Sequence, residues 1–193
     1  MENRERVLRA AAEAFLHRGY HASVDDIARR AGVAKQTVYN RYGSKADLVR
    51  ALIENRVATI TAPLGFPGAL EFPEEALAGY ARALLETVTM PRGLALFRLI
   101  VANVGADPDL AMSAFNSGAR ASRARLAEFL AREGRSGRLA IDDAAEAADF
   151  FAGMVVSHHQ LAGLMGLPVE LDAGRIDRIA SEAARRFVRA YAP

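Results

Sequence analysis

The stretch VDDIARRAGVAKQTVYNRYGSKADLVRALIE, Val24 to Glu54, decides how this chain folds. Ser23 precedes it and can cap a helix, with Asp26 as the return partner of a capping box. Apolar residues then recur at helical spacing until Gly32 ends the helix. A second short helix is expected from about residue 34 to residue 39 or 41. Two short helices joined by a glycine-containing turn predict a helix-turn-helix over residues 24–42.

The second helix carries the polar residues that a DNA-reading surface requires. An α-helix fits the width of the DNA major groove, so its exposed N-terminal face needs short polar side chains. The polar residues at the N-terminal end of this helix are Lys35, Gln36 and Thr37. Donors to phosphate oxygens are expected at its flanks, joined by the backbone amides of the helix that Ser44 begins. The flanking donors are Tyr39, Arg41 and Lys45. The residues alone leave open an ordinary helical hairpin used for packing.

Composition favours a cytoplasmic protein with an anionic partner at one end. The chain has 193 residues and no cysteine, which excludes disulfides and thiolate metal sites. No apolar run approaches the ~20 residues of a membrane span, and the charged N-terminus does not resemble a signal peptide. Residues 1–56 hold eleven Lys or Arg and seven Asp or Glu, although the whole chain has a net charge of only +2. The basic head therefore suggests binding to an anion.

Helical periodicity continues through the rest of the chain, so the fold class is all-α. A first helix is expected over about residues 4–18, and a fourth from Ser44 toward Ile60. A loop rich in Pro and Gly follows over residues 63–73. Five more helices are expected over about residues 74–89, 92–104, 109–133, 142–165 and 174–191. This organisation predicts a three-helix head with the helix-turn-helix in residues 1–56 and a larger helical domain in residues 57–193.

The head resembles the DNA-binding domain of TetR-type transcriptional regulators, the tetracycline-repressor family. The matching features are Ile27-Ala28, Ala31-Gly32-Val33, Thr37-Val38-Tyr39, an aromatic at Tyr42, and Ser44-Lys45 with Leu48. The segments LFRLIVANVGADPDLA and ADFFAGMVVSHHQLAGLMG are similar to the AefR-like branch. The chain departs from the family at Ala34, where the recognition helix commonly begins with Ser.

The resemblance implies a homodimer that binds a palindromic DNA operator and responds to a small-molecule effector. Carried over by position, the residues that approach base edges are Lys35, Gln36 and Thr37. Those that hold the backbone are Tyr39, Arg41 and Lys45, with Ser23 as a further phosphate contact. The family's second domain, which binds ligand and forms the dimer, corresponds to residues 57–193.

The second domain is rich in Ala, Leu, Phe and Met, which predicts a mainly apolar effector pocket with one or two polar anchors. The candidate wall residues are Phe97, Phe115, Phe151, Met154 and His158, and the candidate anchors are Arg98 and Asn103. For each of these aromatic and sulfur-containing residues, a place in the ordinary core is the alternative. Arg98 has alternatives too, in a buried ion pair or as a snorkelling side chain.

Two late helices are candidates for the twofold axis. Residues 144–165 are apolar nearly all round, as expected if one side meets its own core and the other a partner. The expected interface residues are Phe150, Ile176, Ile179, Ala180, Ala183 and Phe187, which would form part of a four-helix bundle. The alternative is that the stripe on the last helix packs within its own chain.

No pattern in the chain predicts an enzyme, a metal site or a cofactor. His158 and His159 are adjacent, so on a helix they point about 100° apart and cannot bind one metal together. Ser157, His158 and Asp149 are helical neighbours, which cannot give the geometry of a catalytic triad. The prediction is a transcriptional regulator, most simply a repressor released by its effector. The alternative is a ligand-binding or enzymatic helical protein whose head mediates protein contacts.

Overall fold

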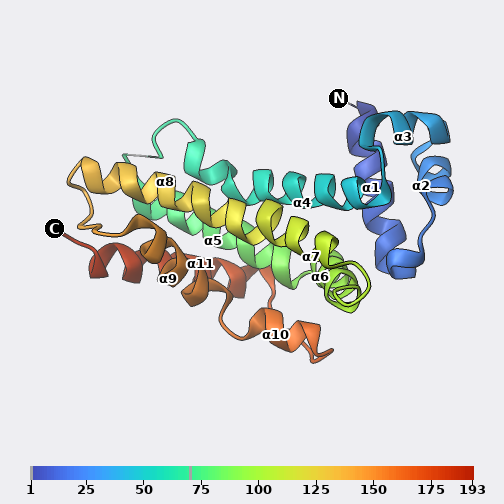
Figure 1. The fold of residues 1–193 in the computed structure, drawn as a ribbon. Coiled ribbons are helices and arrows are strands. Elements are labelled where there is room, and N and C mark those ends of the chain that lie inside the picture. Colours follow the sequence, from blue (N-terminus) through green and yellow to red (C-terminus); the bar gives the residue numbers. More distant parts are fainter. Residues whose placement is uncertain (1, 70) are drawn as a thin grey trace. The chain divides into compact units, whose positions relative to one another are not determined.

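A computed structural model describes residues 2–69 and 71–193, and every regular element in these ranges is a helix (Figure 1). None of the described helices combines the length and apolar character that a membrane crossing requires. By packing, the chain divides into two units. The N-terminal unit contains the residues up to Arg56 together with Pro91–Gly118, and the C-terminal unit contains Val57–Met90 and Ala119–Pro193.

The helices of the N-terminal unit follow the predicted pattern closely. They are α1 (Glu2–Arg18), the 3-10 turn η1 (Gly19–His21), α2 (Val24–Ala31), α3 (Lys35–Tyr42), the first part of α4 (Lys45–Thr61), α6 (Pro91–Ala102) and α7 (Pro108–Phe115). Gly32 ends α2 at φ 64°, in the left-handed region that glycine adopts readily. The Ser23 hydroxyl accepts a hydrogen bond from the Asp26 amide at 3.1 Å, and the Ser44 hydroxyl accepts one from the Asp47 amide at 3.0 Å. Both predicted helix starts are confirmed.

The capping box at Ser23 is only half formed. The predicted return bond, in which the Ser23 amide would donate to the Asp26 carboxylate, is absent from the hydrogen bonds of the described residues, because this carboxylate accepts from arginines instead. Asp26 therefore has a different partner from the one predicted.

The core of the N-terminal unit includes helices from outside residues 1–56. Phe15, Ile27 and Leu48 are its central residues, with at most 2% of their surface exposed. Leu96 from α6 and Leu110 from α7 join the same buried cluster. The boundary at residue 56 stays a prediction, but the packing associates α6 and α7 with the head.

The C-terminal unit contains the remaining helices. They are the 3-10 turn η2 (Ala62–Gly65), α5 (Pro73–Thr89), α8 (Ala121–Arg135), α9 (Ala144–Val156), α10 (His159–Leu164) and α11 (Ala173–Ala190). A π-helical turn, η3 (Asn116–Arg120), separates α7 from α8, so the single helix predicted over residues 109–133 is interrupted. The helix predicted over residues 142–165 is also wrong in one respect, because Ser157 breaks it at φ 46°.

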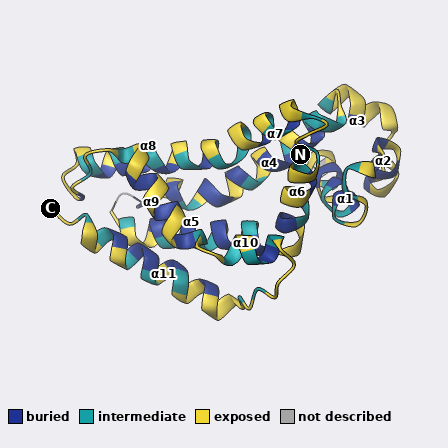
Figure 2. Cartoon of the chain, turned by 60° about the horizontal axis from the view of Figure 1, so that its bottom comes forward, coloured by how far each residue is buried: buried dark blue, intermediate teal, exposed yellow. Residues whose placement is uncertain are grey.

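Aromatic rings fill the centre of the C-terminal core. Phe151 lies 6.2 Å from Tyr80 and 5.0 Å from Phe187, measured between ring centroids. The buried Tyr80 hydroxyl makes a 3.0 Å hydrogen bond with the Ser122 hydroxyl. Burial also raises the pKa of Tyr80, so this phenol remains neutral. Figure 2 shows the alternation of buried and exposed residues along α5 and α11.

The apolar stripe of α11 belongs to this core rather than to an exposed face. Its members Ile176, Ala180, Ala183 and Phe187 are at most 5% exposed within the single chain, and Ile179 is half-buried against them. Their predicted contact with a second protomer needs correction, because their own chain already covers them. The alternative, that the stripe packs within the chain, describes the structure. Phe150 differs from them, with 58% of its surface exposed.

Candidate nucleic-acid interface

Helix α3 is held by one side and presents the other to solvent. Val38 is its one buried residue and joins the core with Ile27 and Leu48. Lys35, Gln36 and Thr37, at the N-terminal end of the helix, are all exposed. Ala34 precedes them with an extended backbone and gives no side-chain cap. The predicted groove-reading residues therefore lie together on an accessible surface.

Two of these residues already have polar partners. The Lys35 ammonium lies 2.8 Å from a carboxylate oxygen of Asp25, and both side chains are more than half exposed. Hydrogen bonding to Asp25 raises the pKa of Lys35, so this residue is a cation at neutral pH. The Gln36 amide donates to the Asn40 side chain at 2.7 Å. Because exposed pairs of this kind exchange readily with water, both side chains can turn to another partner.

The three flanking residues, Tyr39, Arg41 and Lys45, differ in the exposure and in the hydrogen-bond partners of their side chains. Arg41 is exposed and makes no hydrogen bond or ion pair with another described residue, and Tyr39 is 39% exposed. Lys45 is half-buried, since its ammonium donates to the Tyr20 carbonyl at 2.5 Å and lies 4.2 Å from the centre of the Tyr20 ring. Lys45 therefore holds η1 against the start of α4, a structural role that its spacing did not reveal.

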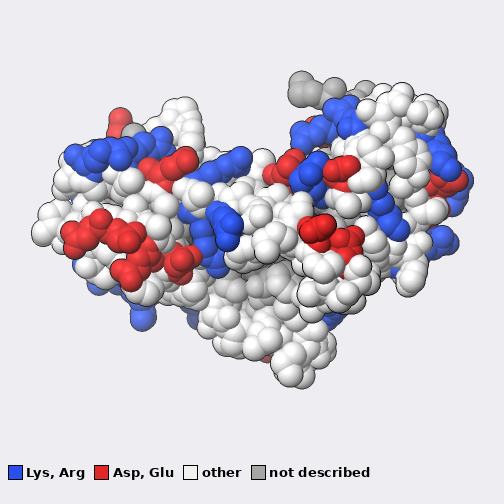
Figure 3. Space-filling model, in the orientation of Figure 1, with Lys and Arg blue, Asp and Glu red and all other residues white. Residues whose placement is uncertain are grey.

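A cluster of arginines surrounds the buried carboxylate of Asp26. Arg30 binds it through Nε at 2.9 Å, Arg29 binds its other oxygen, and Arg18 lies 3.8 Å away. Hydrogen bonding to Arg30, strengthened by the charges of all three arginines, lowers the pKa of Asp26 and keeps it ionised. Figure 3 shows many Lys and Arg side chains on the surface of the N-terminal helices. This cluster was not predicted from the sequence, although the adjacent Arg29 and Arg30 indicate a basic surface there.

The predicted effector residues do not gather in one unit. Those in the N-terminal unit are Phe97, Arg98, Asn103 and Phe115, and those in the C-terminal unit are Phe151, Met154 and His158. Phe97 and Phe115 are 42% and 53% exposed, and Met154 is 45% exposed. Phe151 is fully buried in the aromatic core, which corresponds to the alternative stated for it. The Asn103 amide donates to the Leu99 carbonyl at 2.7 Å.

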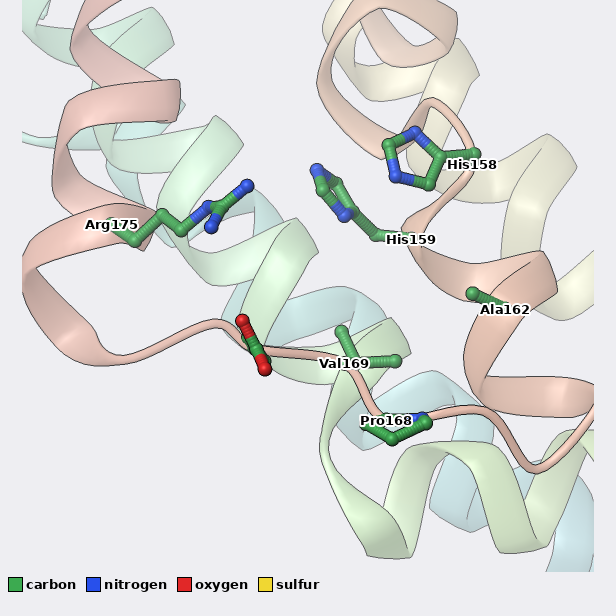
Figure 4. A pocket seen from close by; sticks show the side chains of 7 residues that line it. His158, His159, Ala162, Pro168, Val169 and Arg175 are labelled. Atoms are coloured by element: carbon green, nitrogen blue, oxygen red, sulfur yellow. The ribbon is translucent and has the colours of Figure 1, made fainter.

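One pocket of about 180 Å³ lies in the C-terminal unit, beside α10 and the start of α11 (Figure 4). Arg175 and His159 point toward the same space, and the ring of His158 lies 4.3 Å from that of His159. Partial burial lowers the pKa of His159, and the neighbouring His158 and Arg175 add to the effect. Glu170 also lines the pocket, so the lining is more polar than the predicted effector site. Among the described residues, no three His, Asp or Glu side chains form a group that could hold a metal ion.

Two family models match this chain. The model for bacterial regulatory proteins of the tetR family matches residues 7–52, which include α2 and α3. The model for the C-terminal domain of AefR-like transcriptional repressors matches residues 75–193, more than half of the chain. The chain belongs to the TetR family. Both the predicted family and its AefR-like branch are confirmed.

Individual relatives support the assignment of this TetR-family chain. The transcriptional activator FasR of Mycolicibacterium smegmatis is 42% identical over 62 residues, which cover 32% of this chain and 28% of FasR. The regulator AlkX of Mycobacterium tuberculosis is 31% identical over 116 residues, which cover 55% of this chain and 50% of AlkX. The chain thus spans half or less of these curated relatives. The solved structure of the flavonoid-responsive regulator FrrA is 32% identical, with a TM-score of 0.71, and the match covers 99% of this chain and 97% of FrrA.

TetR-family proteins are transcriptional regulators, not enzymes. They are dimeric, bind DNA operators and respond to small-molecule ligands. In this TetR-family chain, the matched head contains the exposed face of α3. The enzymatic alternative is therefore set aside in favour of regulation of transcription.

Proposed function

We propose that this chain binds a palindromic DNA operator through the exposed face of α3 and regulates transcription there. The observation that carries the proposal is the grouping of Lys35, Gln36 and Thr37 on the accessible N-terminal end of a helix anchored by Val38. Such an end fits the major groove, where amide and ammonium groups distinguish base pairs. Selection of bound sequences from a random duplex library tests it, and an enriched palindrome is the expected result.

Base readers and phosphate holders should fail differently when they are replaced. Gln36→Ala should relax the preference at particular base pairs, whereas Arg41→Ala should weaken binding to all sequences alike. Arg41 is a better test of a phosphate contact than Lys45, because Lys45 also supports the fold of the head. Arg82→Ala in the C-terminal unit, where Arg82 pairs with Asp177, is the control for loss of one positive charge. Unchanged base preference in both Gln36→Ala and Arg41→Ala would contradict this division of roles.

The proposed homodimer uses the exposed apolar residues of α9 and α10. Phe150 and Met154 lie one turn apart on α9, and Leu161 on α10 lies one turn before Met165, the C-cap of that helix; all four are 45–70% exposed. A second copy would cover this apolar surface and give two heads for the two halves of a palindrome. Sedimentation at micromolar concentration should show dimers, and a monomeric wild type would contradict the proposed homodimer.

The proposed effector is a small, mainly apolar molecule that releases the protein from its operator. FrrA is named a flavonoid-responsive regulator, which supports an aromatic effector, and the matching C-terminal family is described as repressors, which supports repression. Within the C-terminal unit, the predicted contact that lines a described pocket is His158, beside His159 in Figure 4. A thermal-shift screen should favour hydrophobic aromatic compounds. Stabilisation by small, highly charged metabolites alone would defeat the idea.

A further inference from the structure

The N-terminal unit contains a pocket of its own, and its lining includes no residue of α3. Its volume is about 170 Å³, and we name it the arginine pocket. Its lining residues are Arg6, Arg9, Ala10, Glu13, Arg29, Arg30, Ala31 and Gly32. Those from α1 recur at positions i, i+3, i+4 and i+7, which is one helix face. The remainder come from the end of α2 and from the turn that leads to α3.

Positive charge exceeds negative charge around the arginine pocket. Arg29 and Arg30 share the single carboxylate of Asp26 with Arg18. Glu13 is paired with Arg92 at 3.2 Å.

Arg6 and Arg9 add two guanidinium groups without a carboxylate of their own. Arg6 donates to the Gly32 carbonyl at 3.2 Å, and Arg9 is exposed and makes no hydrogen bond or ion pair with any described residue. The pocket therefore has an excess of positive charge and, on Arg9, guanidinium N–H groups that can donate to a ligand. A guanidinium presents its N–H groups in a fork that matches the oxygens of a phosphate.

We infer that the arginine pocket holds a backbone phosphate of the operator, with Arg9 as the principal donor. The inference rests on the proposed binding of DNA by α3. Lys35 begins α3 only three residues after Gly32, so the pocket lies within about 10 Å of chain from the groove-reading residues. Phosphate strands border the major groove, which is about 12 Å wide. A helix that enters the groove by its N-terminal end therefore brings the preceding turn near a strand.

The contact between Arg6 and Gly32 gives the site its fixed geometry. It ties α1 to the turn, so that Arg9, on the same face of α1, stays beside the end of α2. A Cβ on residue 32 would lie 2.4 Å from the Arg6 guanidinium, which shows how closely the two approach. The phosphate would thus be bound by groups from two helices, and it would fix the register of the head without reading sequence.

The test compares two arginines of the same helix. Arg9→Gln removes the proposed contact, and Arg4→Gln is the matched control, because Arg4 lies about 140° around α1 from Arg9 and does not line the pocket. Binding to the selected palindrome is measured by fluorescence anisotropy from 50 to 200 mM salt. Loss of one phosphate contact lowers the slope of log K against log salt by about 0.9. With two half-sites, the slope changes by about 1.8. Between 50 and 200 mM salt, the affinity of Arg9→Gln should therefore fall by a factor roughly 12 times smaller than the factor for wild type.

The control and a conservative variant complete the design. Arg4→Gln should keep the wild-type slope, and Arg9→Lys should keep the slope as well because it retains the charge, with weaker binding at each salt concentration. Base preference should be unchanged in every variant. Circular dichroism should show the wild-type helix content, as expected for substitution of an exposed side chain.

Equal slopes for Arg9→Gln and Arg4→Gln would overturn the inference. Inorganic phosphate provides a second arm: if it stabilises wild type but not Arg9→Gln while the DNA slopes are equal, the ligand is free phosphate and the operator assignment is wrong. Failure of the wild type to bind any duplex with a salt-dependent affinity would instead remove the proposed function itself. The two failures are therefore distinguishable.

Discussion

Replacing Phe187 by alanine tests whether the stripe on α11 is core or dimer interface. Phe187 is 1% exposed, and its ring lies 5.0 Å from Phe151 and 4.5 Å from Tyr191. The substitution would leave a cavity at the centre of the C-terminal unit. Removal of a buried phenylalanine typically costs about 3–5 kcal/mol of unfolding free energy. Natural domains are stable by only about 5–15 kcal/mol, so the loss is severe.

The matched control is Phe150→Ala, a substitution of the same kind on the exposed face of α9. Phe150 is 58% exposed, so its loss should change the stability of the protomer by no more than about 0.5 kcal/mol. Urea unfolding followed by circular dichroism measures the first effect, and sedimentation under native conditions measures association. Phe187→Ala should lower the unfolding midpoint with little change in association, and Phe150→Ala should do the reverse. Full stability in Phe187→Ala, combined with loss of the dimer, would refute the assignment of α11 to the core.

Three smaller changes should have effects of known sign. Ala34→Ser should stabilise the protein by about 1 kcal/mol in urea unfolding, because Ala34 has an extended backbone before α3 and gives no side-chain cap; an unchanged midpoint would count against it. Ser157→Gly should raise the melting temperature, because Ser157 at φ 46° is strained at a cost of about 1–3 kcal/mol and glycine is not. Asp26 has a lowered pKa in the folded protein, so its stabilising effect is present above its ordinary pKa and is lost as the pH falls through the folded value. The difference in stability between wild type and Asp26→Asn should therefore be largest near neutral pH and shrink below about pH 4, and a difference independent of pH would contradict this.

The head could be predicted because local rules decide its structure. Ser23 and Ser44 cap helices within reach of their own backbone amides, and Gly32 supplies the left-handed turn, so no distant residue is needed. Element boundaries and the exposed face of α3 followed from the same information.

The features that were predicted wrongly or missed depend on packing between segments that are far apart in sequence. The stripe at Ile176 and Phe187 is equally amphipathic whether it meets its own core or a partner, and only the position of α5 and α9 decides. The helix breaks at Ser157 without a Gly or Pro at that position, so the sequence contains no residue there that predicts a helix end. The arginine pocket combines α1 with the end of α2, and periodicity within one helix cannot reveal such a pairing.

The single carboxylate of Asp26 makes the surface of α2 unequal in its tolerance of substitution. Arg30 contributes most to its ionisation through a hydrogen bond, so loss of Arg18 or Arg29 leaves the carboxylate better paired than loss of Arg30. Loss of Asp26 leaves three neighbouring guanidinium groups repelling one another without a counter-charge. Loss of the acid should therefore cost more stability than loss of any one of its arginines.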